Sequence, residues 1–116
     1  MSRTTVYRIE HTLTRLGPFG TDNPHKDHLS DYIERNAPEF EEADKDCKGF
    51  TAQHRCAVDK RDLIDTWFGP FKAELEAEGY GLFEYQPLAR NVLPSASGCQ
   101  VAFYPYAATP RKQIEW

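Results

Sequence analysis

The sequence has 116 residues, of which 40% are apolar and 28% charged, and a formal net charge of -4. These proportions are typical of a single folded domain, residues 1–116, and they exclude a disordered chain. No apolar run approaches the roughly 20 residues that cross a bilayer, and the N-terminus lacks the apolar core of a signal peptide. We therefore expect a cytoplasmic protein with no membrane contact.

Residues 4–13 alternate between apolar and other side chains, which predicts a β-strand. Arg8 and Glu10 share one face of this strand. Such a pair could hold a phosphate or carboxylate, but opposite charges on one face are more typical of a solvated strand. His11 falls on the apolar face, where we expect a half-buried, hydrogen-bonded histidine.

The next part of the chain predicts little regular structure. Two glycines and two prolines in residues 15–24 indicate a loop. A short helix is expected to begin near Asp27 and to end before Pro38. Residues 38–49 are acidic and aperiodic, which is typical of a surface loop.

The clearest element is a helix over residues 59–78, with Asp59 as the predicted N-cap. Gly69-Pro70 should kink it or divide it into two abutting helices, and Gly79 should end it. Its apolar stripe at helical spacing comprises Leu63, Ile64, Trp67, Phe68, Phe71 and Leu75.

Two further strands are predicted, over residues 80–86 and 99–107, joined by a long connection. The tail either forms a last short strand or packs against the body through Trp116. Because the strands must share a sheet to bury one another, we expect an α+β domain. It would have one small, mainly antiparallel sheet, covered on one face by the Trp-Phe helix, plus one short helix.

The acidic excess is concentrated in one segment. Residues 31–46 hold seven acidic and two basic side chains, so they carry a charge of -5, while the remainder carries +1. Direct nucleic-acid binding needs a basic surface and is not expected. The segment is either simply solvated, or it presents carboxylates to a basic partner with aromatic anchors beside them. The candidate binding residues are Glu34, Glu39, Phe40, Glu41, Glu42, Asp44, Asp46 and Phe50.

Metal and nucleophile signatures are weak. The donors His25, His28, Cys47, His54 and Cys56 suit zinc, but no C-x-x-C pair accompanies them, so no metal is expected and zinc is the less favoured reading. The three cysteines, Cys47, Cys56 and Cys99, should be reduced thiols. Nucleophile-elbow, P-loop and dinucleotide fingerprints do not occur, and no cofactor is expected.

Several short motifs resemble a family of small proteins encoded by bacteriophages and prophages. They are "VYRIEH" followed by "GPF", then "HRC", "LIDTWF", "EGYGLFEY" and "CQVAFYPYAA". The resemblance implies a phage or mobile-element origin, without a known activity, and a location in the host cytoplasm. Small accessory proteins of this origin commonly act on the host, often by blocking a defence nuclease complex.

The layout is also similar to a reduced ADP-ribosyltransferase. That resemblance implies NAD as a possible ligand, contacted by Arg8 on the first strand, with Gln100 at the position of the catalytic glutamate. Gln100 cannot serve as the carboxylate that steadies an oxocarbenium-like transition state. The pocket implied would be lined by Tyr7, Tyr85 and Phe103.

Three hypotheses follow. The favoured one is a phage accessory protein that binds and inhibits a host protein or nucleoprotein complex with a basic surface, through its acidic segment. The alternative is an ADP-ribosyltransferase-like NAD-binding protein, active or degenerate. The third is a self-associating structural domain, and the chain could be a monomer or a homodimer.

Overall fold

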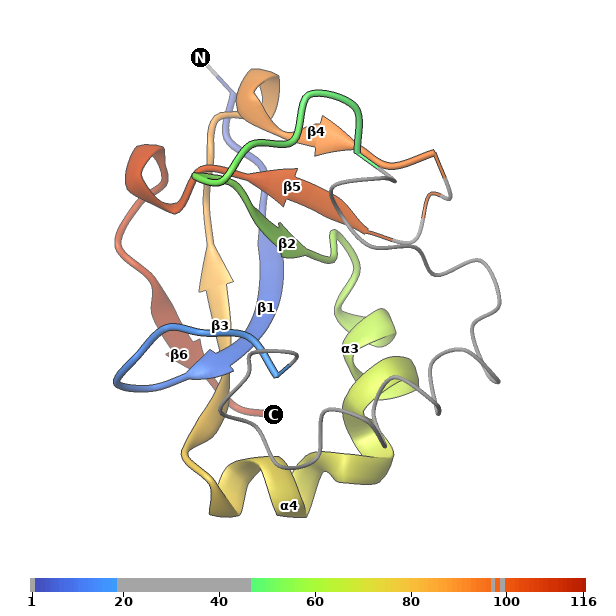
Figure 1. Cartoon of the computed structure of the whole chain (residues 1–116), viewed down its shortest axis with the longest axis vertical. Coiled ribbons are helices and arrows are strands. Elements are labelled where there is room, and N and C mark those ends of the chain that lie inside the picture. The colour runs from blue at the N-terminus through green and yellow to red at the C-terminus, as the bar shows by residue number, and fades with distance from the viewer. Residues whose placement is uncertain (1, 19–46, 97, 99) are drawn as a thin grey trace.

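The structure, a computed structural model, describes residues 2–18, 47–96, 98 and 100–116. Within these residues six short strands form two antiparallel sheets of three strands each. In Figure 1 the second sheet lies across the upper part of the molecule, while the helix α4 lies across its lower end. The α+β class is therefore confirmed, but the expectation of a single shared sheet is wrong.

The first sheet has the order β1-β3-β6. β1 (Val6–His11) pairs along its whole length with β3 (Tyr80–Tyr85), from Val6 opposite Tyr85 to His11 opposite Tyr80. β6 (Lys112–Ile114) pairs with the other edge of β3. The predicted strand over residues 80–86 and the short C-terminal strand are thus both observed.

The second sheet has the order β2-β5-β4, with β2 at Arg55–Ala57, β4 at Leu93–Pro94 and β5 at Val101–Phe103. It joins the first sheet through a backbone bridge between Tyr7 and Val58, which exchange N–H···O bonds of 2.8 and 2.9 Å. β5 is shorter than the predicted strand over residues 99–107, because Pro105 begins a 3-10 turn, η3 (Pro105–Ala107).

The connection after β3 also holds more structure than the sequence indicated. A 3-10 turn, η2 (Ala89–Asn91), precedes β4. Both β2 and β4 lack any strand-length pattern in the sequence, and backbone pairing to β5 is what defines them.

The predicted helix is present in three pieces. α3 (Arg61–Phe68) is followed by the 3-10 turn η1 (Gly69–Phe71) and then by α4 (Lys72–Ala77). The predicted interruption at Gly69-Pro70 is confirmed, since η1 carries the proline near its N-terminus. Gly79 follows the helix with φ +91°, the left-handed conformation that ends many helices.

One detail of this helix was predicted wrongly. The N-cap is Lys60, in an extended conformation and without a side-chain capping bond, so Asp59 does not cap the helix. Among the described residues no helix has the length and apolar character needed to cross a membrane.

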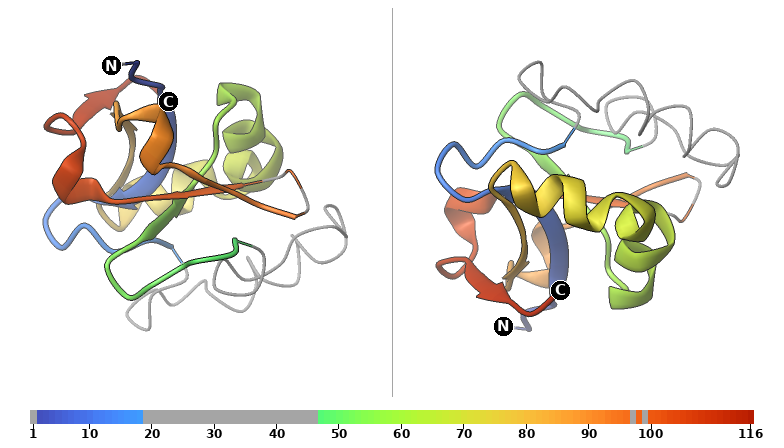
Figure 2. Two further views of the ribbon diagram at one scale, coloured as in Figure 1. Left: turned by 90° about the horizontal axis from the view of Figure 1, so that it is seen from above. Right: turned by 90° about the horizontal axis from the view of Figure 1, so that it is seen from below.

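Both faces of the β1–β3 pair are buried. Ile9 and Leu82 pack toward the helix with Ile64, Trp67 and Leu75. On the opposite face a second cluster is packed against the second sheet, and Figure 2 shows that sheet crossing on the side away from α4. It comprises Val6, Ala57, Phe83, Tyr85, Val101 and Phe103.

This two-sided burial overturns the expectation of a solvated strand face. Arg8 is 7% exposed and Glu10 is 1% exposed. Charges at such positions are retained only when they are paired and hydrogen-bonded. His11, in contrast, is half-buried as expected, and its Nδ1 accepts from the backbone N–H of Leu13 at 3.2 Å.

Candidate functional site

A cavity of about 330 Å³ lies between β1, β2 and α3. This volume is at the lower end of the range of about 300–1,000 Å³ that is usual for small-molecule pockets. Its described apolar lining comes mainly from the first core cluster: Tyr7, Ile9, Val58, Ile64, Trp67 and Phe68. Its described polar lining consists of Arg8, His54, Arg55, Cys56 and Gln100.

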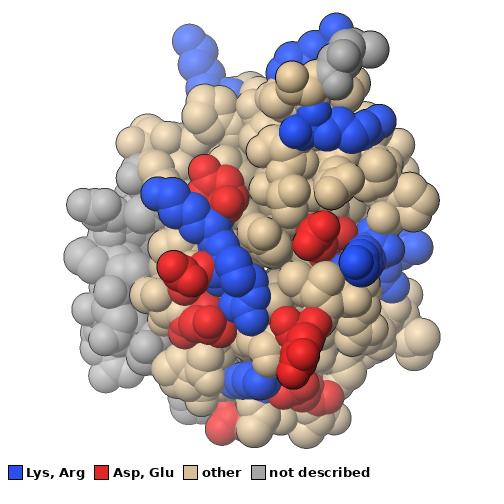
Figure 3. Space-filling view, turned by 180° about the vertical axis from the view of Figure 1, so that it is seen from behind, with Lys and Arg blue, Asp and Glu red and all other residues tan. Residues whose placement is uncertain are grey.

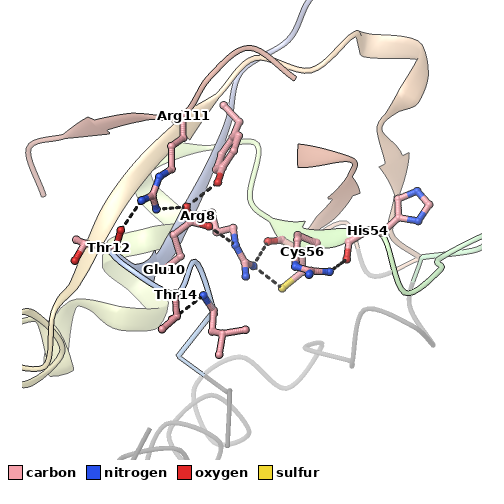
Figure 4. Close-up of polar contacts among 10 residues, drawn as sticks. Arg8, Glu10, Thr12, Thr14, His54, Cys56 and Arg111 are labelled. Carbon is pink, nitrogen blue, oxygen red and sulfur yellow. Dashed lines mark hydrogen bonds and ion pairs between the residues drawn. The ribbon is translucent and has the colours of Figure 1, made fainter. Parts of the chain in front are cut away.

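A buried ionic network centred on Glu10 adjoins this cavity through Arg8 (Figure 4). Its Oε2 accepts from Arg8 Nε at 2.9 Å. Its Oε1 accepts from the Tyr85 hydroxyl at 2.6 Å and from Arg111 Nη1 at 2.7 Å. Both oxygens of the carboxylate are therefore occupied.

Tyr85 contributes a neutral donor to this network. Burial raises the pKa of its phenol well above the ordinary value, and the hydrogen bond to Glu10 and the charge of Glu10 raise it further. The positive charges of Arg8 and Arg111 oppose this effect but do not reverse it. The Tyr85 hydroxyl consequently remains protonated throughout the neutral range.

Arg111 ties the C-terminal segment to the first strand. Besides Glu10, it donates from Nη2 to the backbone carbonyl of Thr12. Its guanidinium carbon lies 4.2 Å from the centroid of the Phe83 ring, a cation–π geometry. The residue just before β6 is thereby fixed onto the same face that carries Arg8.

Arg8 connects the network to the cavity. Its Nη1 donates to the carbonyl oxygen of Cys56 at 2.8 Å and lies 3.7 Å from the Cys56 sulfur, so the guanidinium spans from β1 to β2. Its Nη2 lies beside Gly17, where an added Cβ would approach to 3.2 Å. Both Arg8 and Gly17 line the cavity.

His54 belongs to an aromatic stack at another part of the lining. Its ring is 3.9 Å from that of Tyr104 and 5.6 Å from that of Phe50, at angles below 30°. The backbone N–H of Thr51 donates to Nδ1 at 3.0 Å, which requires the neutral ring to carry its proton on Nε2. Burial lowers the pKa of His54, in agreement with a neutral ring.

We expect the stability of the protein to fall as the pH drops below about 6.5, the ordinary histidine pKa. The folded-state pKa of His54 is lowered, so in this window the unfolded chain binds a proton that the folded chain does not. Urea unfolding of wild type and His54→Phe at several pH values between 7.5 and 5 measures the effect. All other residues are the same in both proteins, so the wild type should lose more stability than the variant. Parallel curves would contradict the prediction.

The structure brings together two residues that the sequence placed far apart. Arg8 and Gln100, the positions implied by the transferase resemblance, line the same cavity, and so does Tyr7. Tyr85 and Phe103 belong instead to the second core cluster, so that part of the implied pocket was wrong.

The remaining candidates are placed less informatively. The acidic candidates Glu34, Glu39, Glu41, Glu42, Asp44 and Asp46, together with Phe40, lie outside the described residues, as do His25, His28 and Cys99. Phe50 is half-buried and lines the cavity. Among the described residues no three metal-ligating side chains gather; Cys47 is buried, and Cys56 is a free thiol beside Arg8.

The sequence reasoning missed Glu10, Tyr85 and Arg111 as partners. One signal was available: the stretch "YGLFEY" is apolar at nearly every position, which is typical of a strand buried on both faces. A strand that pairs with such a strand in the same sheet has no solvated face either. Its charged side chains therefore need partners inside the protein.

Neither the search of curated proteins nor the search of solved structures found a significant match. A family model described as "Bacteriophage T4 Y00F protein" matches residues 1–116. This agrees with the resemblance to phage proteins drawn from the motifs, whereas the likeness to ADP-ribosyltransferases stays a prediction. The match covers the whole chain, and the protein therefore belongs to the bacteriophage T4 Y00F protein family.

Proposed function

We propose that this phage protein is an accessory factor that binds a small organic molecule in the cavity between β1, β2 and α3. The observation that carries the proposal is the cavity itself: about 330 Å³, with apolar walls and a few convergent polar groups. That combination is the usual character of a ligand pocket. Among these polar groups, Arg8 comes from β1, Arg55 and Cys56 come from β2, and Gln100 directly precedes β5.

A panel of one- and two-ring compounds tests this proposal by thermal and urea denaturation. A compound that binds the folded state should stabilise it by about 1.4 kcal/mol when its free concentration is ten times Kd. Ala52 is exposed and lines the cavity, so Ala52→Trp should abolish the stabilisation. Ala107→Trp, at an exposed position in η3, is the matched control. Stabilisation that survives in Ala52→Trp would place the ligand elsewhere.

NAD is one candidate within this proposal, because Arg8 and Gln100 share the cavity. The volume favours a ligand with one nucleoside or ring system over a whole dinucleotide. Gln100 also supplies an amide where the transferase reaction needs a carboxylate, which favours binding without turnover. We therefore expect NAD to stabilise the protein less than AMP does.

A second candidate function is inhibition of a host defence machine through the acidic segment, in the cytoplasm of the host cell. Its support is the phage family and the charge distribution. The described residues hold eleven basic and nine acidic side chains, while residues 19–46 hold three basic and nine acidic. On the face in Figure 3 the drawn acidic and basic side chains are interspersed. A basic host protein or nucleoprotein complex would therefore meet its strongest attraction at residues 31–46.

Charge reversal tests this second candidate. Changing Glu39, Glu41, Glu42 and Asp44 to lysine should abolish capture of the host complex from lysate. The matched control reverses four exposed acidic residues of the helical region, namely Asp59, Asp62, Glu74 and Glu76. Equal capture by both variants would reject the acidic segment as the binding surface. Light scattering on the free protein separately distinguishes a monomer from a homodimer.

A further inference from the structure

Among the described residues, the charges around the cavity do not balance. The buried network contains two guanidinium groups, of Arg8 and Arg111, against the single carboxylate of Glu10. The Tyr85 phenol adds a donor but no charge, because its pKa is raised. Arg55 adds a further cation to the lining, and the described lining residues include no Asp or Glu. A buried excess of positive charge is stabilised by an anion that reaches it.

One edge of Arg8 is placed to receive that anion. The side chain is 7% exposed, Nε is engaged by Glu10, and Nη1 is engaged by Cys56. Among the described residues the structure shows no acceptor for Nη2. Gly17 lies beside Nη2 and, because it has no side chain, approaches it with backbone atoms alone. A guanidinium N–H with this geometry binds carboxylate or phosphate oxygens strongly.

The apolar part of the cavity lining favours a ligand that contains an apolar ring. Trp67 and Phe68 supply aromatic surface from α3, and Ile64 and Val58 supply aliphatic surface. Aromatic walls favour a ring over a flexible chain, since stacked and edge-on arrangements add to the area that is buried. The volume lies at the lower end of the usual range, so it favours a compact ligand over a whole dinucleotide.

Resting on the small-molecule function proposed above, we infer that the ligand is an aromatic organic anion. Its carboxylate or phosphate binds Arg8 Nη2 at the cavity wall, and its ring lies against Trp67 and Phe68. An aryl carboxylate and a nucleoside monophosphate share this chemistry. A cation of the same ring shape is disfavoured by Arg8 and Arg55.

Isothermal titration with matched probes tests the inference. Indole, indole-3-acetate and tryptamine share one ring system and differ in charge, and adenosine and AMP form a second pair. We expect at least one anion to bind about tenfold or more tighter than its neutral parent, the value of one charge-assisted hydrogen bond. Tryptamine should bind more weakly than indole. In each pair the gain in affinity of the anion over its neutral parent is compared. The pair with the larger gain shows whether the site favours a carboxylate or a phosphate.

Gly17→Ala tests the placement without removing the buried Arg8, whose loss could prevent folding. The added methyl group lies 3.2 Å from Nη2, so it should restrict access of an anion to Nη2 and remove the preference for the anion, measured as the ratio of the indole-3-acetate and indole affinities of the same variant. Gly69→Ala is the matched control, since its Cβ meets nothing within 4 Å. An anion preference that persists in Gly17→Ala would overturn the assignment to Arg8.

The two proposals fail in different ways. If no probe of either pair binds, the small-molecule function itself falls. If neutral, cationic and anionic probes bind equally, that function stands and the inference about charge is wrong. If the anions bind best and Gly17→Ala alone abolishes the difference, both are supported.

Discussion

Replacing Glu10 with glutamine is expected to lower the free energy of unfolding by about 3–5 kcal/mol, the usual result of breaking a buried ion pair on one side. The side chains of Arg8 and Arg111 are 7% and 16% exposed, so neither guanidinium can regain full hydration when the carboxylate charge is removed. Glutamine keeps the shape of the side chain and isolates the effect of the charge. Equilibrium urea unfolding at pH 7 measures the difference.

Glu84→Gln is the control for this experiment. Glu84 lies on β3 of the same sheet and is partly exposed, so its change should stay within about 0.5 kcal/mol. The double variant Glu10→Gln/Arg111→Met should recover part of the lost stability, because it removes one of the two unpaired cations. A loss below about 1 kcal/mol in Glu10→Gln would mean that the arginines reach solvent and that the network does not stabilise the fold.

Phe103→Ala is expected to destabilise the protein by about 3–5 kcal/mol, the range for large-to-small changes in a core. Phe103 is 0% exposed in the second core cluster, and its ring lies 4.9 Å from that of Tyr85. Its loss would leave a void beside the residue that donates to Glu10. Thermal and urea unfolding should both report the change.

Tyr106→Ala provides the comparison, since Tyr106 is also aromatic but 84% exposed, and little change is expected. Phe103→Leu should fall between the two, because leucine refills part of the void. A Phe103→Ala protein as stable as Tyr106→Ala would show that the second sheet does not form a real core with β1 and β3.

The sequence predicted well the elements that carry their own local signal. The helical stripe from Leu63 to Leu75 repeats at a period that only a helix satisfies, and the Gly69-Pro70 pair explains its division into α3, η1 and α4. β3 was predicted to within one residue, because apolar and aromatic residues are bounded by Gly79 and Pro87.

The features that depend on distant partners could not be predicted in this way. β2 and β4 are three and two residues long, and their pairing to β5 is visible only in three dimensions. The polar face of β1 was wrongly expected to be solvated. Period-two alternation shows that the two faces of a strand differ, but it does not show whether the polar face is exposed to solvent.

The candidate site was predicted in part. Arg8 and Gln100 were named through the transferase resemblance, and the structure places both at one cavity. Arg111 carries no local signal that relates it to Glu10, from which it is separated by 101 positions. The long-range ion network was therefore inaccessible to motif and periodicity arguments, although it determines the charge of the cavity.

The pairing of β1 has a consequence for how the protein is made. A nascent chain leaves the ribosome N-terminus first, whereas Val58, β3 and Arg111, which all bind β1, are synthesised later. Val6, Ile9 and Glu10 therefore emerge long before these later segments can cover them. The first sheet can therefore form only after β3 has been synthesised, and until then the exposed apolar residues of β1 are prone to aggregation.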